Sequence, residues 1–229
     1  MTDPIATLAG GLIVSCQAYP GEPLRHPETM AQMAEAVVAG GAAAIRAQGL
    51  ADISFIKGRT TVPLIGLWKD GHDGVFITPT LRHARAVRDA GAEIVALDGT
   101  RRPRPDGLTL ADTIADTIAR LRDSGPTLIM ADCGSLDDAL AARDAGADLI
   151  GTTLAGYTGD RPLTTGPDLD FLAHLVTHLP GLPIVAEGRV HTPEQARAAL
   201  NTGAHAVVVG TAITHPTTIT SWFRQALAN

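Results

Sequence analysis

Eight short apolar segments recur along the chain, and segments with helical spacing of their apolar residues separate them. Four follow an Ala-Gly or Thr-Gly pair, in AGGAAAIRAQG, AGAEIVALDGT, AGADLIGTTLAG and TGAHAVVVGTA, which start at residues 39, 90, 145 and 202. The other four are GLIVSCQ, VPLIGLWK, TLIMADCG and PIVAEGRV, which start at residues 11, 62, 127 and 183. A glycine before an unbroken apolar run predicts a helix end followed by a buried strand.

Strands that alternate with helices predict parallel βαβ units. Amphipathic patterns such as PETMAQMAEAVVAG and TPEQARAALNTG fill the intervals, and Ser135 and Thr192 are suited to cap helices. The segment LADISFIKGRT predicts a shorter helix after the second strand. Eight units of this kind favour an α/β fold that is a (β/α)8 TIM barrel, with a doubly wound open sheet as the alternative. No linker-like stretch divides the chain, so residues 1–229 are expected to form a single domain.

Polar residues gather at the ends of the predicted strands, whereas the strand starts are apolar or glycine. The polar strand ends are Gln17, Arg46, Gln48, Lys69, Asp98, Asp132, Thr152, Thr153, Glu187, Arg189 and Thr211. In a barrel, the carboxyl ends of all strands meet at one rim, where barrel enzymes carry their chemistry. One polar residue at a strand end commonly marks only the beginning of a loop, but so many together predict a functional site.

Two glycine-rich loops are predicted on the same rim, EGRVHTPEQA after the seventh strand and VGTAITHP after the eighth. Loops in these places bind phosphate in many barrels through backbone N–H groups and a helix N-terminus. Gly188 and Gly210 let the backbone approach an anion closely, and Arg189 adds a cation. We therefore expect a phosphate site that includes these residues and Thr211, and the alternative is two ordinary turns with an exposed arginine.

Lys69 ends the third apolar run, PLIGLWK, where a lysine has no packing role. Three roles suit it: a solvated loop lysine, a Schiff-base nucleophile as in barrel aldolases, or a base. Both chemical roles need a lysine pKa lowered by burial or by a nearby cation, and Arg46 on the neighbouring second strand is such a cation. Glu187, in VAEGR, lies amid small apolar residues, where burial disfavours its charge and a close Lys69 restores it. The pair predicts proton transfer next to a carbonyl, and the alternative is a structural ion pair of Glu187 with Arg189 or Arg46.

Composition narrows the class of protein. Hydrophobic residues make up 45% and charged residues 18% of the 229 residues, so a sizeable core is expected. The net charge of −6 argues against nucleic-acid binding, and no apolar run is long enough to span a membrane. The N-terminal residues lack the features of a signal peptide. Cys16 and Cys133 have no metal-ligand or CxxC spacing, so we expect two free thiols, no metal and a cytoplasmic location.

Three further features have a chemical and a structural interpretation. Cys16 and Cys133 would end strands on opposite sides of the barrel, so we expect small buried fillers and not a pair of reacting thiols. His174 and His178 have metal-ligand spacing, but they lie on an outer helix without a third ligand, which predicts surface histidines. The basic stretch RRPRP at residues 101–105 is short and lies in an acidic chain, so we expect a rim loop after the fourth strand.

An ordered set of motifs resembles one enzyme family over essentially the whole chain. GGLIVSCQ, AIRAQG, ITPT, DGTRRPRPDG, GTTLAGYT, VAEGR and VGTAIT together are similar to the N-acetylmannosamine-6-phosphate 2-epimerase family. The resemblance implies a (β/α)8 barrel that interconverts N-acetylmannosamine 6-phosphate and N-acetylglucosamine 6-phosphate, in sialic acid and amino-sugar breakdown. It implies no metal, nucleotide or other cofactor. Asp70 stands where many members of the family have arginine, which changes the charge next to Lys69.

The resemblance also assigns residues. It implies that Lys69 is the base and Glu187 the active-site glutamate, and that the phosphorylated N-acetyl amino sugar is bound by Gln17, Arg46 and Asp132. Its phosphate glycines match Gly188 and Gly210, with Arg189 beside them, and we expect Thr152 to contact the substrate as well. It further suggests a homodimer, formed partly through the last helix. Whether Lys69 alone moves the C2 proton, or Glu187 returns it on the opposite face, stays open.

Two rival functions of other classes remain. A non-catalytic phosphosugar-binding barrel that regulates transcription or binds RNA would keep the phosphate loops and need no base at the rim. A barrel lyase or aldolase would use Lys69 as a Schiff base. The combination of Lys69 with Glu187 argues against the regulator, and borohydride trapping on Lys69 would reveal the aldolase.

Overall fold

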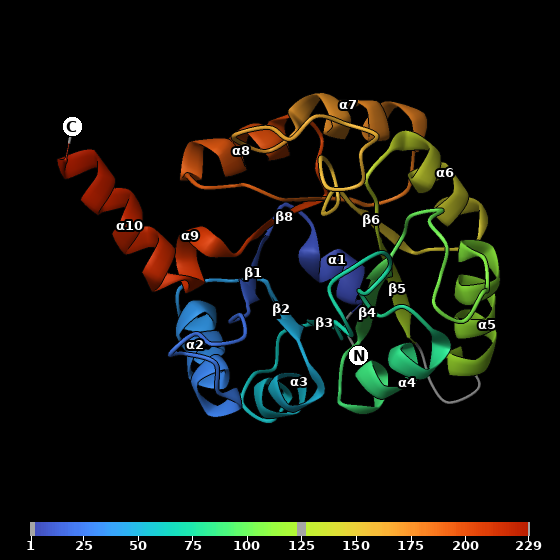
Figure 1. The fold of residues 1–229 in the computed structure, drawn as a ribbon, viewed down its shortest axis with the longest axis horizontal. Coiled ribbons are helices and arrows are strands. Elements are labelled where there is room, and N and C mark those ends of the chain that lie inside the picture. The colour runs from blue at the N-terminus through green and yellow to red at the C-terminus, as the bar shows by residue number, and fades with distance from the viewer. Residues whose placement is uncertain (1–2, 123–126, 229) are drawn as a thin grey trace.

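The chain folds into a closed barrel of parallel strands surrounded by helices (Figure 1). A computed structural model describes residues 3–122 and 127–228, and the order of strands in the sheet follows the order in the chain. The eight strands are β1 (Leu12–Cys16), β2 (Ala44–Gln48), β3 (Leu64–Leu67), β4 (Ile94–Asp98), β5 (Leu128–Asp132), β6 (Leu149–Gly151), β7 (Ile184–Glu187) and β8 (Ala206–Val209). β1 pairs with both β2 and β8, which closes the sheet and confirms the barrel over the open sheet.

Helices follow the strands around the outside of the barrel, and one short helix precedes β1. They are α1 (Pro4–Leu8), α2 (Pro27–Ala39), α3 (Leu50–Lys57), α4 (Leu81–Asp89), α5 (Leu110–Arg122), α6 (Leu136–Asp144), α7 (Leu169–His178), α8 (Pro193–Asn201), α9 (Thr211–Thr214) and α10 (Pro216–Leu227). The predicted caps form, because the hydroxyl of Ser135 accepts the N–H of Asp138 and that of Thr192 accepts the N–H of Gln195. Over the described ranges, no helix is both long and apolar enough to cross a bilayer.

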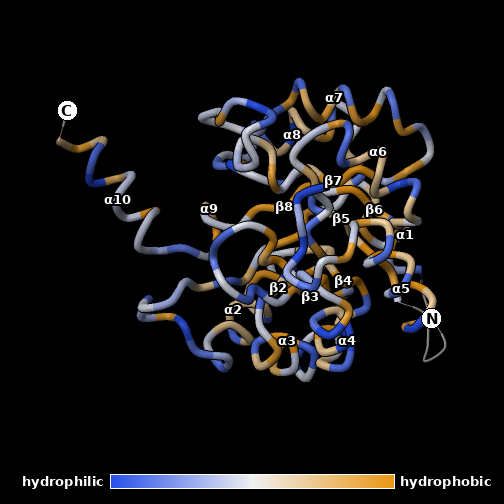
Figure 2. The backbone as a smooth tube through the Cα atoms, turned by 45° about the vertical axis from the view of Figure 1, so that its right-hand side comes forward, coloured by the Kyte–Doolittle hydropathy of each residue, from blue (hydrophilic) through white to orange (hydrophobic). Residues whose placement is uncertain are grey.

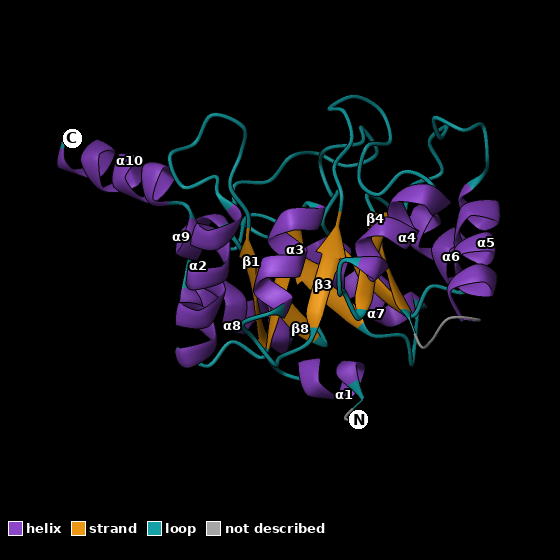
Figure 3. Ribbon diagram, turned by 90° about the horizontal axis from the view of Figure 1, so that it is seen from below, coloured by secondary structure: helices purple, strands orange, loops and turns teal. Residues whose placement is uncertain are grey.

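Side-chain alternation along the strands divides the core into two layers. Inside the barrel lie residues such as Ile13, Ala44 and Met130, and Leu8 of α1 packs with them. Figure 3 shows α1 below the strands, at the amino-end opening of the barrel. The outer layer lies between the strands and the helices, and it contains the alternate strand residues, such as Val14 and Ile45. The tube in Figure 2 is correspondingly apolar through the strands. Because successive strand side chains point to opposite faces, a polar residue in step with the inner set must point into the barrel.

Both cysteines belong to the outer layer and are fully buried. Cys16 is the last residue of β1, and Cys133 comes directly after β5. Both are free thiols, and burial raises the pKa of Cys16 to about 12. This placement agrees with small buried fillers and offers no facing pair of reactive thiols at the rim.

The last helix departs from the barrel pattern. α10 extends away from the ring of helices in Figure 1, and none of its residues is buried. Phe223 is 70% and Leu227 is 89% exposed, while Trp222, in the middle of the helix, has its ring 4.9 Å from that of His191. Barrel closure therefore does not bury α10 against its own chain.

Candidate active site

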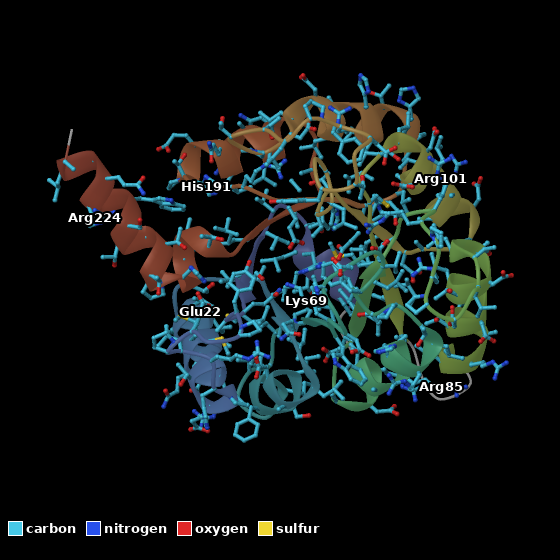
Figure 4. The ribbon with its side chains drawn as sticks, viewed as in Figure 1. Glu22, Lys69, Arg85, Arg101, His191 and Arg224 are labelled. Carbon is cyan, nitrogen blue, oxygen red and sulfur yellow. The ribbon has the colours of Figure 1, made fainter. Side chains whose placement is uncertain are left out.

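A cavity of about 510 Å³ opens at the rim formed by the carboxyl ends of the strands. Most of the predicted site residues line it, namely Gln17, Arg46, Lys69, Glu187, Gly188, Arg189, Gly210 and Thr211. Figure 4 places Lys69 near the centre of the ring, over the mouth of the barrel. The expected gathering of polar strand ends into one site is therefore present in the fold.

Arg46 forms the floor of the site. Its side chain is 1% exposed, and it binds Asp132 through both terminal nitrogens, Nη2 to Oδ2 at 2.6 Å and Nη1 to Oδ1 at 3.2 Å. The same Nη1 lies 3.2 Å from Oε2 of Glu187. One buried cation thus faces two carboxyl groups, and fork-shaped pairing fixes the plane of the guanidinium. The Arg46–Glu187 ion pair that the sequence offered as an alternative exists, together with the cavity.

Lys69 comes just after β3 and points toward the chain's first strand. Its Nζ donates a hydrogen bond to Oε1 of Gln17 at 3.1 Å, and Gln17 in turn donates from Nε2 to Oγ of Ser15 at 2.9 Å. The ring of Tyr19 lies under the ammonium, 5.6 Å from Nζ to the centroid. Burial lowers the pKa of Lys69, and the nearby positive charge of Arg46 lowers it further. These are the two influences that a lysine base requires.

Glu187, the last residue of β7, carries the second perturbed group. Its side chain is 14% exposed, and burial raises its pKa to about 7, aided by the charge of Asp132 and opposed by Arg46. A carboxyl group that titrates near neutrality beside a lysine with a lowered pKa is an arrangement suited to acid–base chemistry.

The two predicted phosphate loops also border the cavity. Gly188 has φ 112° and Arg189 has φ 56°, a left-handed conformation that is uncommon for a residue with a side chain. Gly210 precedes the short helix α9, which starts at Thr211. A methyl group on Gly210 would come 3.2 Å from Cβ of Ser15, so glycine allows the backbone at residue 210 to lie close to β1.

The guanidinium of Arg189 is engaged by the protein. Nη1 donates to the carbonyl of Ala155 at 3.0 Å, Nη2 to Oγ1 of Thr164 at 3.0 Å, and Nε to the carbonyl of Gly166 at 3.2 Å. Its centre also lies 5.3 Å from the ring of Tyr157. Arg189 therefore ties the loop after β6 to the turn after β7, a structural role that its sequence position did not reveal.

Two predicted substrate ligands do not reach the cavity. Asp132 is fully buried beneath Arg46. The hydroxyl of Thr152 donates to the carbonyl of Glu187 at 2.8 Å and accepts the N–H of the same residue at 2.9 Å, so it fixes the backbone of β7. The neighbouring Thr153 lines the cavity instead, with its hydroxyl oxygen 2.7 Å from Oδ1 of Asp132 and 3.1 Å from Oε2 of Glu187. Alternation from Leu149, which points inward, was the signal that distinguishes the two threonines.

Asp70 is oriented away from Lys69. Its Oδ2 lies 2.9 Å from Nε2 of the buried His83 on α4, and Nδ1 of that histidine lies 2.7 Å from Oγ1 of Thr80. The backbone of Lys69 bridges to Ile77 across the same loop. The aspartate thus anchors the loop that carries the lysine.

The remaining chemical alternatives have structural explanations. His174 and His178 lie on α7, where Nδ1 of His178 bonds the carbonyl of His174 at 2.8 Å. Across residues 3–122 and 127–228, no three His, Cys, Asp or Glu side chains are grouped to hold a metal ion. The basic stretch 101–105 lies in the loop after β4, where Arg102 binds Oδ2 of Asp98 at 2.7 Å and Arg104 donates to the carbonyl of Asp98.

Comparison with known proteins gives one consistent result. Residues 30–229 match the model of a family described as "Putative N-acetylmannosamine-6-phosphate epimerase". A protein of Cutibacterium acnes named "Putative N-acetylmannosamine-6-phosphate 2-epimerase" is 67% identical over 224 residues, which cover 97% of this chain and 96% of that protein. A protein of the same name from Caldanaerobacter subterraneus is 47% identical, with 96% and 92% covered.

A solved structure agrees with the sequence comparisons. The N-acetylmannosamine-6-phosphate 2-epimerase from Clostridium perfringens superposes with a TM-score of 0.92 at 39% identity, and the match covers 98% of this chain and 96% of that one. The likeness therefore extends over the whole barrel.

Proposed function

The chain belongs to the N-acetylmannosamine-6-phosphate epimerase family, and on this premise we propose that it interconverts N-acetylmannosamine 6-phosphate and N-acetylglucosamine 6-phosphate, as an N-acylglucosamine-6-phosphate 2-epimerase. The observation that carries the proposal is the meeting of Lys69, Glu187 and Arg46 in one rim cavity, beside two glycine turns suited to phosphate. The two rival functions explain this combination less well, because a regulator needs no tuned base and the relatives are named as epimerases.

The chemistry follows from the acidity of C2. In the open-chain sugar, C2 lies next to the C1 aldehyde, so a base can remove the C2 proton while the C–H electron pair moves into a C1=C2 double bond and the charge to O1. Neutral Lys69 is the group suited to take that proton. Return of a proton to the opposite face of C2 restores the aldehyde and inverts the centre. Either Lys69 alone or protonated Glu187 can supply it, because both border the cavity.

We propose Arg46, which lines the cavity, as the donor for the developing charge on O1. Its Nε is buried and has no hydrogen-bond partner among the residues that the structure describes. A buried donor left unpaired is costly, and a substrate oxygen that accepts its hydrogen removes that cost. Because this oxygen gains charge as the proton leaves C2, the interaction strengthens in the transition state and so accelerates the reaction.

The phosphate end supplies binding energy remote from C2. We assign it to backbone N–H groups of the turns at Gly188–Arg189 and Gly210–Thr211, with Arg189 holding the first turn in place. Charged hydrogen bonds of this kind contribute roughly 1.5–3 kcal/mol each. Asp132 and Thr152 then act behind the surface of the cavity, by fixing Arg46 and the backbone of Glu187.

Incubation with each epimer, with NMR of the products, tests the function. Both 6-phosphates should convert to the same equilibrium mixture, and unphosphorylated N-acetylmannosamine should react with at least about a hundredfold lower kcat/KM, the effect of losing two charged hydrogen bonds. Absence of the second epimer after prolonged incubation with either phosphate would refute the proposal. Equal rates for the phosphorylated and unphosphorylated sugars would refute the phosphate site only.

We also propose that residues 1–229 act as one domain within a homodimer, assembled partly through α10. Phe223 and Leu227 expose apolar area on a helix that its own barrel does not cover, and such area commonly marks a contact between subunits. The proposed setting is the cytoplasm, in sialic acid and amino-sugar breakdown. Two buried free thiols agree with a reducing compartment.

Light scattering tests the assembly. At micromolar concentration the mass should be near twice the 23.7 kDa of the chain. Phe223→Asp should shift it to monomer, because a charge replaces exposed apolar area that the proposed interface would bury. Phe55→Asp is the matched control, since Phe55 is 45% exposed on α3, and it should leave the dimer intact. A wild-type protein that is monomeric throughout would end the dimer proposal.

A further inference from the structure

Three strand ends bring two carboxyl groups and one hydroxyl into direct contact. The hydroxyl oxygen of Thr153 lies 2.7 Å from Oδ1 of Asp132 and 3.1 Å from Oε2 of Glu187. These are the same two oxygens that Nη1 of Arg46 approaches, each at 3.2 Å. Gly151 preserves the arrangement, because a methyl group there would lie 3.0 Å from both Oδ1 of Asp132 and Oγ1 of Thr153.

A threonine hydroxyl has one hydrogen, so it cannot donate to both carboxyl groups. The distance of 2.7 Å to Asp132 is typical of a charge-assisted O–H···O bond, and the contact with Glu187 is longer. With its hydrogen on Asp132, the Thr153 oxygen presents a lone pair to Glu187. That lone pair repels an ionised carboxylate and accepts a hydrogen bond from a protonated one.

The charges around Glu187 allow one titratable proton, which can be bound by either Glu187 or Lys69. Arg46 on β2 faces it together with Asp132 on β5, and Lys69 and Tyr19 lie near it from the loops after β3 and β1. One arginine cannot neutralise two carboxylates. A proton held by either Glu187 or Lys69 balances the group, and both placements have the same total charge.

We propose that Thr153 is a positioning residue that places this proton on Glu187 and so leaves Lys69 as the neutral amine. The proton passes between Nζ of Lys69 and the carboxylate of Glu187, and no other bond changes. The hydrogen bonds then run in one direction, from Glu187 to Thr153 and from Thr153 to Asp132, with every hydroxyl hydrogen used once. The importance of this proton position for catalysis rests on the proposed function, because it leaves the Lys69 amine neutral and able to remove the C2 proton.

The substrate-free protein tests the proton assignment by NMR. With glutamate labelled with ¹³C at the side-chain carboxyl carbon, comparison with Glu187→Gln identifies the Glu187 signal and its titration midpoint. Thr153→Val keeps the shape and removes the hydroxyl, so the protonated carboxyl loses its acceptor. We expect the midpoint to fall by about half to one pH unit, the size of one hydrogen bond to a titrating group. Thr153→Ser should restore the wild-type value.

Controls separate this effect from general disturbance. Thr177→Val on the outer face of α7 removes a hydroxyl that bonds only the carbonyl of Ala173, at 2.8 Å, and should leave the Glu187 midpoint unchanged. If Thr153→Val does not fold, Thr153→Ala provides the same measurement. A midpoint that rises in these variants would show that Thr153 donates to Glu187, and an unchanged midpoint would show no coupling. Either result overturns the proposal.

Kinetics give a second readout. Ionised Glu187 raises the pKa of Lys69, so the rising limb of kcat/KM against pH should move upward in Thr153→Val, by at most the half to one unit expected for Glu187. That shift means a loss of up to about tenfold on the low-pH side and near-normal rates above the limb. A uniform loss at every pH would indicate a merely structural role. If the NMR midpoint moves as expected but the wild type turns over no sugar phosphate, the proposed function fails and the proton assignment stands.

Discussion

Lys69→Met is expected to lower kcat for C2 epimerisation by at least about a thousandfold while the protein stays folded. The side chain ends in the cavity, hydrogen-bonded to Gln17, so its loss removes no part of the apolar core. Methionine keeps the length and apolar stem of the lysine and cannot take a proton. NMR of the product measures the rate, and circular dichroism measures the fold.

Lys57→Met is the matched control for this substitution. Lys57 pairs with Glu93 on the outer side of the barrel, and the pair is partly exposed, so we expect nearly normal kcat and a stability change within about 1 kcal/mol. More than a tenth of wild-type activity in Lys69→Met would exclude Lys69 as the essential base. A borohydride-stable adduct on Lys69 in the wild type would instead support Schiff-base chemistry.

Arg46→Met is expected to have the largest effect on stability. Arg46 is 1% exposed and is bound by Asp132 and Glu187, so its removal leaves two buried carboxyl groups without their cation. Breaking a buried pair from one side costs roughly 3–5 kcal/mol of unfolding free energy. Activity should be lost as well, because the donor to O1 is gone. Urea unfolding at neutral pH gives the stability difference.

The pH dependence of this deficit has a defined sign. Without Arg46, the pKa of Glu187 in the folded protein, already raised by burial, rises further above its value in the unfolded chain. The folded state then binds more protons, so the penalty grows as pH rises and shrinks as pH falls toward 5. Arg59→Met is the control, since its pairs with Glu28 and Glu35 are at the surface and should change stability little at any pH in this range. A deficit in Arg46→Met that does not change between pH 5 and 8 would contradict this account.

The sequence predicts the barrel well because each repeated unit specifies it locally. Glycine-closed helices before unbroken apolar strands leave few topologies, and the polar strand ends must then share a rim. Lys69, Arg46 and Glu187 meet as expected because each is in step with the inner face of its strand. These parts of the site follow from position alone.

Other parts depend on tertiary packing that no local pattern records. Thr152 and Thr153 are adjacent and chemically alike, and only strict alternation from Leu149 shows which one points inward. The guanidinium of Arg189 finds its partners in the loop after β6, far along the chain. The apolar pattern of α10 likewise does not distinguish a helix packed on its own barrel from one that extends away from it.

The most direct test of the central claim is turnover in D2O with wild-type protein. If C2 is deprotonated by Lys69, the epimer formed in D2O carries deuterium at C2, and its H2 signal disappears from the ¹H NMR spectrum as the reaction proceeds. Substrate deuterated at C2 should also react with a primary isotope effect, which reveals C–H cleavage even where a shielded lysine returns the same proton. A product that keeps its full H2 signal through active turnover, together with no isotope effect from C2-deuterated substrate, would contradict C2 deprotonation.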